Sequence, residues 1–315
     1  KAGFPLEFIS VGGLKGKGGL DLLRSIFRLP YGFIQAFRLV GKYRPNVALG
    51  VGGYSSGPVL VAAALRGVPT IIHEQNAFPG LTNRLLARIV KKVVVAFAEA
   101  LPRLKRSDGV VTGNPVRAEF FSATQRPSDP ATVRRQRLLI FGGSQGSRVL
   151  NDAMTGALLF LSRLKDRLDI VHQTGPNELQ KVQQAYRTSG AFPNARVIAY
   201  LDPIVDEIAA ADLVVCRAGA MTIGELCAIG RPAIFVPFAA ATNNHQELNA
   251  RVVERAGGGI VITEAQLTPE KLGAAITEIM TDPERTRRMG AAARALAAPE
   301  ATKKIVDSIE SIQRT

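Results

Sequence analysis

Short apolar runs rich in β-branched residues recur along the chain, and longer segments with helical spacing separate them. Such runs predict buried strands, and the segments between them predict helices. The repeated alternation indicates doubly wound parallel sheets with right-handed crossovers. The sequence therefore predicts an α/β fold with two Rossmann-like domains whose sheet edges face a cleft. The predicted strands are 6–11, 47–51, 70–76, 93–95, 138–141, 169–172, 196–200, 213–215, 233–236 and 259–262.

A polar stretch divides the alternating pattern into two parts. Residues 122–137 are rich in Pro, Ser, Thr, Asp, Gln and Arg, which is typical of a linker. We therefore predict an N-terminal domain at 1–135 and a C-terminal domain at 136–298. The residues after them, 299–315, have helical spacing, and we expect this helix to pack back on the first domain.

The clearest candidate for chemistry follows the predicted strand 213–215. The small residues Ala218, Gly219 and Ala220 lead into a predicted helix over 222–229. Small residues let a ligand approach the backbone, and free N–H groups at a helix start suit phosphate. The carboxylate of Glu225, one turn into the helix, could accept two hydrogen bonds from a sugar diol. The alternative is a tight turn with an acidic residue favoured by the helix dipole.

Two further glycine loops lie between a strand and a helix. In the loop 142–147, Ser144 is placed to bind a phosphate with its hydroxyl and N–H groups. The loop 52–58 could cradle a diphosphate, with Pro58 in the first turn of the next helix. The spacing of glycines in 142–147 differs from the dinucleotide fingerprint, and no acidic residue ends a strand about 20 residues later. We therefore expect no nicotinamide cofactor, and no cofactor of another kind is indicated.

Polar side chains cluster at two other predicted strand or loop ends. His73 and Glu74 follow a buried run, where an acid–base role competes with that of a satisfied half-buried histidine. Amides at 243–246 could bind sugar hydroxyls or cap the following helix. Arg117 could reach a base or a phosphate, or be simply exposed. The sequence contains no Asp-x-Asp, so we expect a donor site that works without a metal.

Charge is unevenly distributed along the chain. Residues 1–117 carry 17 Lys and Arg against 5 Asp and Glu, which accounts for twelve of the fourteen net positive charges. This asymmetry indicates an anionic partner, namely a membrane, a nucleic acid or a phosphorylated substrate. We expect no nucleic acid, because the sequence has no basic–aromatic ladder and no helix-turn-helix or zinc-finger spacing. The predicted helix 20–42, broken near Pro30, alternates apolar and basic residues, as a lipid-bound surface or a packed helix with a solvated face would.

Other features bound the class of protein. Cys216 and Cys227 are the only cysteines, so a reducing compartment is expected. No apolar run reaches the roughly 18 residues of a spanning helix, and no export signal is visible. The sequence begins at Lys1 rather than Met, which leads us to expect that it is a fragment or has lost preceding residues.

Six motifs in a fixed order make the sequence resemble one family. The resemblance is to the MurG family of membrane-associated N-acetylglucosaminyltransferases, and it covers essentially the whole chain. It implies a GT-B fold and the inverting transfer of N-acetylglucosamine from UDP-GlcNAc to lipid I, the undecaprenyl-diphospho-muramyl-pentapeptide, to give lipid II. It also implies a peripheral location on the cytoplasmic face of the bacterial plasma membrane, near cell-wall synthesis and division proteins. The motifs are Gly52-Gly53-Tyr54 with Ser56-Gly57-Pro58, His73-Glu74-Gln75-Asn76, Gly113-Asn114-Pro115-Val116-Arg117, Gly142-Gly143-Ser144-Gln145-Gly146, and Arg217-Ala218-Gly219-Ala220-Met221-Thr222 with Glu225.

The resemblance also implies roles for individual residues. Glu225 matches the carboxylate on the ribose diol, Ser144 the residue at the donor phosphate, and Leu201 an aliphatic residue whose backbone meets the uracil. The further donor contacts that it implies are Asn76, Arg117, Ala220, Met221, Thr222, Ile223, Gly224, His245 and Gln246. The family's membrane-docking surface would correspond to 15–44, including Lys15, Lys17, Leu23, Arg24, Ile26, Phe27 and Arg28.

The sequence departs from the family at its start. The family opens with a strand and a Gly-Gly-Thr-Gly-Gly-His loop, which carries acceptor-diphosphate contacts and a histidine proposed as general base, and this sequence lacks both. Glu74 is then the remaining candidate for proton removal. Two alternatives stay open: a UDP-GlcNAc 2-epimerase of the same two-domain layout, and an inactive nucleotide-sugar-binding protein at the membrane surface.

Overall fold

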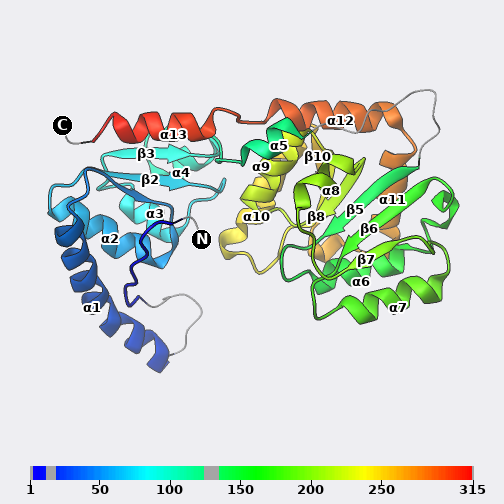
Figure 1. Ribbon diagram of the computed structural model, residues 1–315, viewed down its shortest axis with the longest axis horizontal. Coiled ribbons are helices and arrows are strands. Elements are labelled where there is room, and N and C mark those ends of the chain that lie inside the picture. Colours follow the sequence, from blue (N-terminus) through cyan, green and yellow to red (C-terminus); the bar gives the residue numbers. More distant parts are fainter. Residues whose placement is uncertain (1–2, 12–18, 124–134, 314–315) are drawn as a thin grey trace. The chain divides into compact units, whose positions relative to one another are not determined.

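The chain forms two compact units in the computed structural model (Figure 1). The structure describes residues 3–11, 19–123 and 135–313, with the backbone alone at 19–29. Unit 1 comprises Lys1–Gly113 and Glu300–Thr315, and unit 2 comprises Asn114–Pro299. The division falls earlier than the domain boundary predicted at 135, because the short helix α5 (Ala118–Ser122) packs on α9 (Ala220–Ile229) of unit 2.

Unit 1 is built on a parallel sheet of four strands in the order β1-β2-β3-β4. Its core gathers apolar side chains from the strands and from the helices that connect them, among them Leu60, Ile72, Leu86 and Val93. The elements are α1 (Gly19–Tyr43), β1 (Ala48–Gly50), α2 (Gly53–Leu65), β2 (Thr70–Glu74), α3 (Leu81–Leu86), β3 (Lys92–Val95), α4 (Ala100–Leu104), β4 (Val110–Val111) and α13 (Ala301–Glu310).

The start of the chain differs from the prediction. Residues 6–11 form no strand, and Leu6 is 75% exposed. The segment instead lies against α1, where the Ser10 N–H donates to Gln35 Oε1 at 2.7 Å. A Cβ at Gly32 would lie 2.5 Å from the Ser10 carbonyl oxygen, so the close approach needs a glycine. The local alternation of residues was present, but strand formation also requires a partner edge, which the local sequence does not encode.

Two predicted effects of proline are also wrong. Helix α1 continues through Pro30 rather than breaking there, and α2 begins at Gly53, so that Pro58 lies inside the helix and not in its first turn. A proline inside a helix removes one backbone hydrogen bond at a cost of about 3 kcal/mol. Packing offsets this cost, because buried residues of α1 and α2, such as Val40 and Ala62, belong to one apolar cluster.

Unit 2 contains a parallel sheet of six strands in the order β10-β9-β8-β5-β6-β7. Helices connect every pair of successive strands, as the β-α alternation predicts. The strands are β5 (Gln136–Phe141), β6 (Leu168–Gln173), β7 (Arg196–Ile198), β8 (Leu213–Cys216), β9 (Ala233–Phe235) and β10 (Gly259–Val261). The helices besides α5 and α9 are α6 (Arg148–Ala157), η1 (Ser162–Leu164), α7 (Leu179–Ser189), α8 (Ile204–Ala210), η2 (Thr242–Asn244), α10 (His245–Arg255), η3 (Glu264–Gln266), α11 (Pro269–Met280) and α12 (Pro283–Ala295).

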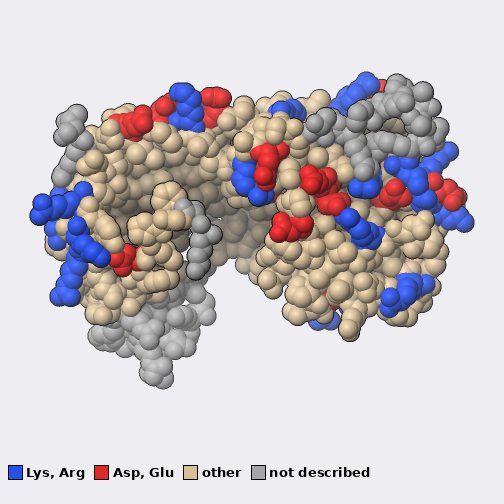
Figure 2. Space-filling model, in the orientation of Figure 1, with Lys and Arg blue, Asp and Glu red and all other residues tan. Residues whose placement is uncertain are grey.

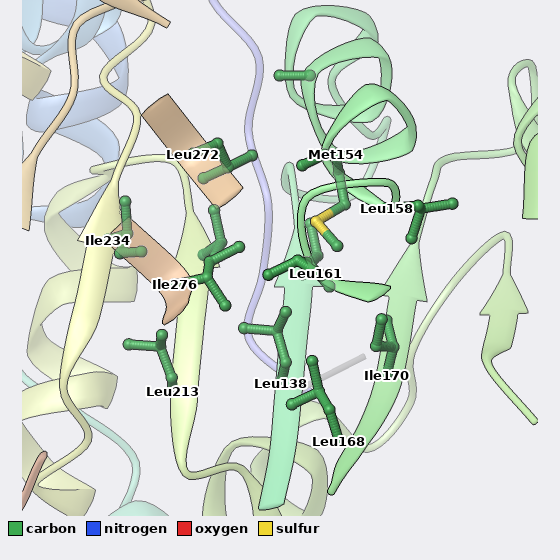
Figure 3. Packing of buried hydrophobic residues seen from close by; sticks show 14 of the residues in the cluster. Leu138, Met154, Leu158, Leu161, Leu168, Ile170, Leu213, Ile234, Leu272 and Ile276 are labelled. Carbon is green, nitrogen blue, oxygen red and sulfur yellow. The ribbon is translucent and has the colours of Figure 1, made fainter. Parts of the chain in front are cut away.

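The core of unit 2 fixes the sheet between helices. Leu138 of β5 and Leu213 of β8 point toward Met154 of α6 and Ile276 of α11 in one continuous cluster (Figure 3). All four residues of β8 are buried, because a central parallel strand is covered on both faces. The rigid sheet positions the loops at its carboxyl edge.

Candidate functional site

The candidate site lies at the carboxyl edge of the unit 2 sheet, where the direction of strand order reverses. β5 and β8 are neighbours, with Phe141 opposite Cys216 in register. From β5 the chain continues to β6 and β7 on one side, whereas β9 and β10 lie beyond β8 on the other. The loops that follow β5 and β8 therefore part at this point, and such a switch point is where open parallel sheets bind ligands.

The loop after β5 is a glycine turn that exposes its backbone. Gly143 and Gly146 have φ values of +93° and +74°, a region that favours glycine. The residue that caps α6 is Ser147, whose Oγ accepts the Leu150 N–H at 3.3 Å. Ser144, predicted at the helix start, instead lies in the exposed turn three residues before the cap. Ser144 is exposed there, so a ligand could reach it from solvent.

The loop after β8 leads directly into α9. Its N-cap is Gly219, which has no side chain to occupy the first N–H groups of the helix. Helix α9 begins at Ala220, two residues before the predicted start. A helix of ten residues with an uncapped N-terminus is a favourable site for a phosphate or another anion.

Arg217 joins the two loops across the switch point. Its Nη2 donates to Ser147 Oγ at 2.6 Å, and its Nη1 donates to the Val236 carbonyl at 3.1 Å. Nη1 also forms a 2.6 Å ion pair with Glu264, and both side chains are mostly buried. The sequence placed Arg217 in a motif but gave it no role, because its partners come from three other strand ends.

Glu225 is held half-buried on α9, beside the segment 114–117. Burial raises the pKa of its carboxyl group, Arg117 opposes this, and Glu119 adds to it. Arg117 forms an ion pair with Glu119 at 2.9 Å. A Cβ at Gly224 would lie 2.9 Å from Val116 Cγ2, so the glycine allows this segment to lie close to α9. The structure thus brings Arg117 and Glu225 together within unit 2.

The remaining predicted donor-binding residues of unit 2 differ in their exposure to solvent. Met221 is exposed and Thr222 is partly exposed, whereas the side chains of Ile223 and Leu201 are buried. Ile223 and Leu201 could therefore meet a ligand only through their backbone. The sequence pattern alone did not separate these two groups, because it does not show which face of a helix is covered.

Gln246 and His245 begin α10 near the loop after β8. Gln246 Oε1 accepts the N–H groups of Ala218 at 3.3 Å and of Phe238 at 3.0 Å. Its oxygen is therefore occupied, and its amide nitrogen is the group suited to a sugar hydroxyl. His245 Nδ1 lies 2.8 Å from the Thr242 carbonyl oxygen. Gln246 bonds to preceding strand ends rather than to its own helix, which does not fit the alternative of a helix cap.

In unit 1, Glu74 ends β2 and is only 2% exposed. Its Oε1 accepts from the backbone and side-chain N–H groups of Asn76 at 3.0 and 3.3 Å. Its Oε2 accepts from the Gly80 N–H at 3.1 Å and from Asn83 Nδ2 at 2.8 Å. The lone pairs that a general base would use are engaged by four donors. These contacts argue against the predicted role in proton removal and make Glu74 an anchor of the loop 75–83.

The surroundings of His73 also argue against an acid–base role. It is buried, and its Nε2 lies 3.2 Å from the Gly113 carbonyl oxygen. Burial lowers its pKa, while the contact with Gly113 and the charge of Glu74 oppose the shift. This is the satisfied, buried histidine that the sequence left as one of two possibilities.

The structure describes only part of the predicted membrane surface. Lys15 and Lys17 lie outside the described residues, and Leu23, Arg24, Ile26, Phe27 and Arg28 lie in α1 where the backbone alone is described. Within the described part of the chain, no helix combines the length and apolar character needed to cross a membrane. The same residues include no group of three His, Cys, Asp or Glu side chains that could hold a metal ion.

Two α/β units, each built on a parallel sheet, have the architecture of the GT-B fold. The family model described as the glycosyltransferase family 28 C-terminal domain matches residues 137–308, and the model of the N-terminal domain matches residues 1–95. The chain belongs to glycosyltransferase family 28 and, within it, to the MurG transferases, as the following relatives show.

The relatives span nearly the whole chain. A Myxococcus xanthus protein named UDP-N-acetylglucosamine–N-acetylmuramyl-(pentapeptide) pyrophosphoryl-undecaprenol N-acetylglucosamine transferase is 45% identical over 98% of this chain and 79% of its own length. A Geobacter metallireducens protein of the same name is 39% identical over 100% and 86%. The crystal structure of Acinetobacter baumannii MurG superposes with a TM-score of 0.80 at 31% identity, covering 98% of this chain and 85% of that one.

A likeness to epimerases concerns the fold alone. The structure of a putative UDP-N-acetylglucosamine 2-epimerase from Listeria monocytogenes has a TM-score of 0.68 but only 15% identity, over 90% of this chain and 80% of that one. At this level of identity the likeness shows a shared architecture and carries no statement about the site.

Proposed function

We propose that this protein transfers N-acetylglucosamine from UDP-GlcNAc to the muramyl-pentapeptide diphospho-undecaprenol acceptor, the reaction in the names of its relatives. The observation that carries the proposal is the 45% identity over 98% of the chain to a transferase of that name. The loops at the unit 2 switch point suit a donor site, because they combine a glycine turn, a helix N-terminus and a half-buried carboxylate.

The donor would be held by backbone and side chains from both loops. The N–H groups at the start of α9 and in the turn around Ser144 would stabilise the negative charge that develops on the departing diphosphate. Glu225 would accept hydrogen bonds from the ribose diol, with Arg117 near the same ligand. Gln246 would donate its remaining N–H groups to the sugar. The structure supplies no free carboxylate at Glu74 for the acceptor proton, so we assign no general base within the described residues.

A transfer assay tests this proposal. The purified protein is incubated with radiolabelled UDP-GlcNAc and a lipid I analogue, and the label is followed into the lipid fraction and into free ManNAc. We expect label in lipid only, at a rate that a Glu225→Gln variant reduces roughly tenfold or more at low donor concentration. Label in ManNAc would favour an epimerase, and donor binding without either product would favour a binding protein.

We also propose that unit 1 docks on the anionic cytoplasmic face of the plasma membrane. On the face drawn in Figure 2, Lys and Arg side chains gather at one end of unit 1, while unit 2 intersperses both signs of charge. In α1, Tyr31 and Ile34 are exposed, and so is Arg38 one turn further on. Exposed apolar side chains next to basic ones are typical of a surface that rests among anionic headgroups.

Vesicle binding tests the membrane proposal. We expect the protein to sediment with vesicles that contain anionic phospholipid and to be released by salt, because screening weakens the attraction. Ile34→Glu should weaken sedimentation, whereas Leu159→Glu, which changes an exposed leucine of unit 2, should not. Equal sedimentation of both variants would contradict docking through α1.

A further inference from the structure

Gln173, the last residue of β6, lies between two loops of the donor site. β6 pairs with β5 on one side and β7 on the other, with Gln173 opposite Phe141 and Ile198. The chain beyond Phe141 is the glycine turn, and the chain beyond Ile198 leads to Leu201. Because parallel strands end at the same edge, the residue that ends the middle strand is flanked by both loops.

The side chain of Gln173 bonds to both loops with one amide group. Its Nε2 donates to the Gly143 carbonyl at 3.0 Å and to the Ala199 carbonyl at 3.1 Å. The residue is 3% exposed, so these bonds are made in a largely dry environment. Both N–H groups of the amide are used, and each holds the backbone of a different loop.

The neighbouring backbone makes the junction tight. A Cβ at Gly146 would overlap the Thr174 carbonyl, and a Cβ at Gly175 would overlap the Gln145 carbonyl. The glycine turn therefore lies directly on the end of β6. Asn151 of α6 adds a bond from its Nδ2 to the Thr174 carbonyl at 3.0 Å. A small shift of Gly143 would consequently also move the exposed backbone around Ser144.

We propose that Gln173 is a positioning residue for the donor nucleotide, which sets the distance between the phosphate-binding turn at 142–147 and the nucleoside-side segment at 199–201. The inference rests on the proposed function, because it assumes that a UDP-sugar spans these two segments. Gln173 does not touch the ligand. It supports two backbone segments that do. Each of the two carbonyls also accepts a backbone N–H group, Gly143 from Gly146 at 2.9 Å and Ala199 from Gly175 at 3.0 Å, and the Gln173 amide adds the bonds that tie both segments to one strand end.

The test compares two glutamines that make the same kind of bond. Gln173→Met removes both donors and keeps the length of the side chain. The matched control is Gln183→Met, because Gln183 Nε2 also donates to a backbone carbonyl, that of Val197, at 3.1 Å, on a helix away from the glycine turn. We expect Gln173→Met to raise the Kd for UDP-GlcNAc in calorimetry and the donor KM about tenfold, since two buried hydrogen bonds are lost. The kcat and the acceptor KM should stay within about twofold.

Gln173→Glu provides a second variant with a sharper expectation. It places a carboxylate against two carbonyl oxygens, so donor binding should fall further than in Gln173→Met. Should Gln173→Met not fold, Gln173→Asn keeps the amide but retracts it by one methylene, and an increase in donor KM is again expected. A merely structural role would lower the unfolding temperature and kcat without a selective change in donor KM, which would overturn the inference.

The outcomes separate the inference from the proposed function. If the wild-type protein binds UDP-GlcNAc and Gln173→Met binds it equally well, or if Gln183→Met weakens binding to the same extent, the positioning role is wrong while the function stands. If the wild-type protein does not bind UDP-GlcNAc in calorimetry, the donor site itself is wrong, and the inference falls with it.

Discussion

Among single residues, Glu225 is the one from which we predict a pH dependence of donor binding. Burial raises the pKa of its carboxyl group above the ordinary value of 4.5. A carboxylate accepts hydrogen bonds from a diol better than a protonated carboxyl group does, so donor binding should weaken as the pH falls toward this pKa. We expect the donor KM to rise between pH 7.5 and 5 in the wild-type protein. In Glu225→Gln the donor KM should be higher at pH 7.5 and should not show the rise that protonation of Glu225 causes. Parallel curves of donor KM against pH for the two proteins would contradict a role of Glu225 in donor binding.

His172 gives unit 2 a sensitivity to acid. Its Nδ1 lies 3.2 Å from the Tyr186 hydroxyl and its Nε2 lies 3.1 Å from Asn151 Oδ1. Because Asn151 uses its Nδ2 as a donor to Thr174, its oxygen must accept, which places the proton of His172 on Nε2. Burial lowers the pKa of His172 to about 3. The neutral ring is therefore a requirement of the folded state.

The lowered pKa of His172 predicts in which direction the stability of the fold changes with pH. Below the ordinary pKa of 6.5, the unfolded chain binds a proton at His172 that the folded chain does not bind until about pH 3. Stability should therefore fall as the pH drops below 6.5, by up to about 1.4 kcal/mol per pH unit from this group. We would measure the free energy of unfolding in urea at pH 7, 6 and 5. It should decrease less steeply with falling pH for His172→Gln than for the wild-type protein. Equal slopes would mean that the group titrates in the folded state.

The sequence predicted candidate site residues more readily than the residues that support them. Glu225 was predicted from its place in a strand, turn and helix pattern, all of which is local. The partners of Arg217 and Gln173 were missed, because Ser147, Glu264 and Ala199 meet them only through the strand order. A polar residue at the end of a buried strand was the available signal for Gln173. The predicted strand stopped one residue short of it.

Among the elements, strands that are buried on both faces were easy to predict. β8 and β5 are short β-branched or leucine-rich runs, because a parallel strand between two helical layers has no solvent face. The failures have nonlocal causes. Residues 6–11 alternate as a strand does but pair with no sheet edge. Helices α1 and α2 continue through Pro30 and Pro58, because they pack against each other. Local pattern predicts what an element is made of, but its bounds depend on its neighbours.

Helix α9 depends on Gly224 for its approach to the segment 114–117. An added Cβ would lie 2.9 Å from Val116 Cγ2 and would push the segment that carries Arg117 away. We expect Gly224→Ala to raise the donor KM a few-fold, although alanine favours helices by about 1 kcal/mol. Val116→Ala in the same chain should restore the KM by making room. The control is Gly57→Ala in α2, where the nearest side-chain atom, on Thr82, is 3.6 Å away. A stabilised Gly224→Ala variant with unchanged KM would contradict the argument.

In the whole molecule, unit 1 is assembled from two distant parts of the chain. The residues of α13 and just beyond it return to the first sheet, where Ile309 and Ile312 pack with Ile71 and Val94. Lys92 Nζ donates to Ser311 Oγ at 2.8 Å, at the same place. A central apolar face of the sheet is thus covered by the end of the chain rather than by a neighbouring crossover. The sequence predicts a helix at 299–315 that packs back on the first domain, and α13 belongs to unit 1.

This arrangement predicts that a change at the end of the chain weakens unit 1 and spares unit 2. Ile312→Ala removes buried methyl groups and should lower the free energy of unfolding of unit 1 by about 2 kcal/mol. Val306→Ala, at an exposed position of α13, should cost much less. The affinity of unit 2 for UDP should stay within about twofold in both variants, because the site at the switch point keeps its loops. Thermal unfolding with calorimetric UDP titration checks both parts. Equal destabilisation by the two variants would contradict the contribution of Ile312 to the core of unit 1. A loss of UDP binding in Ile312→Ala would show that the units do not depend on separate cores.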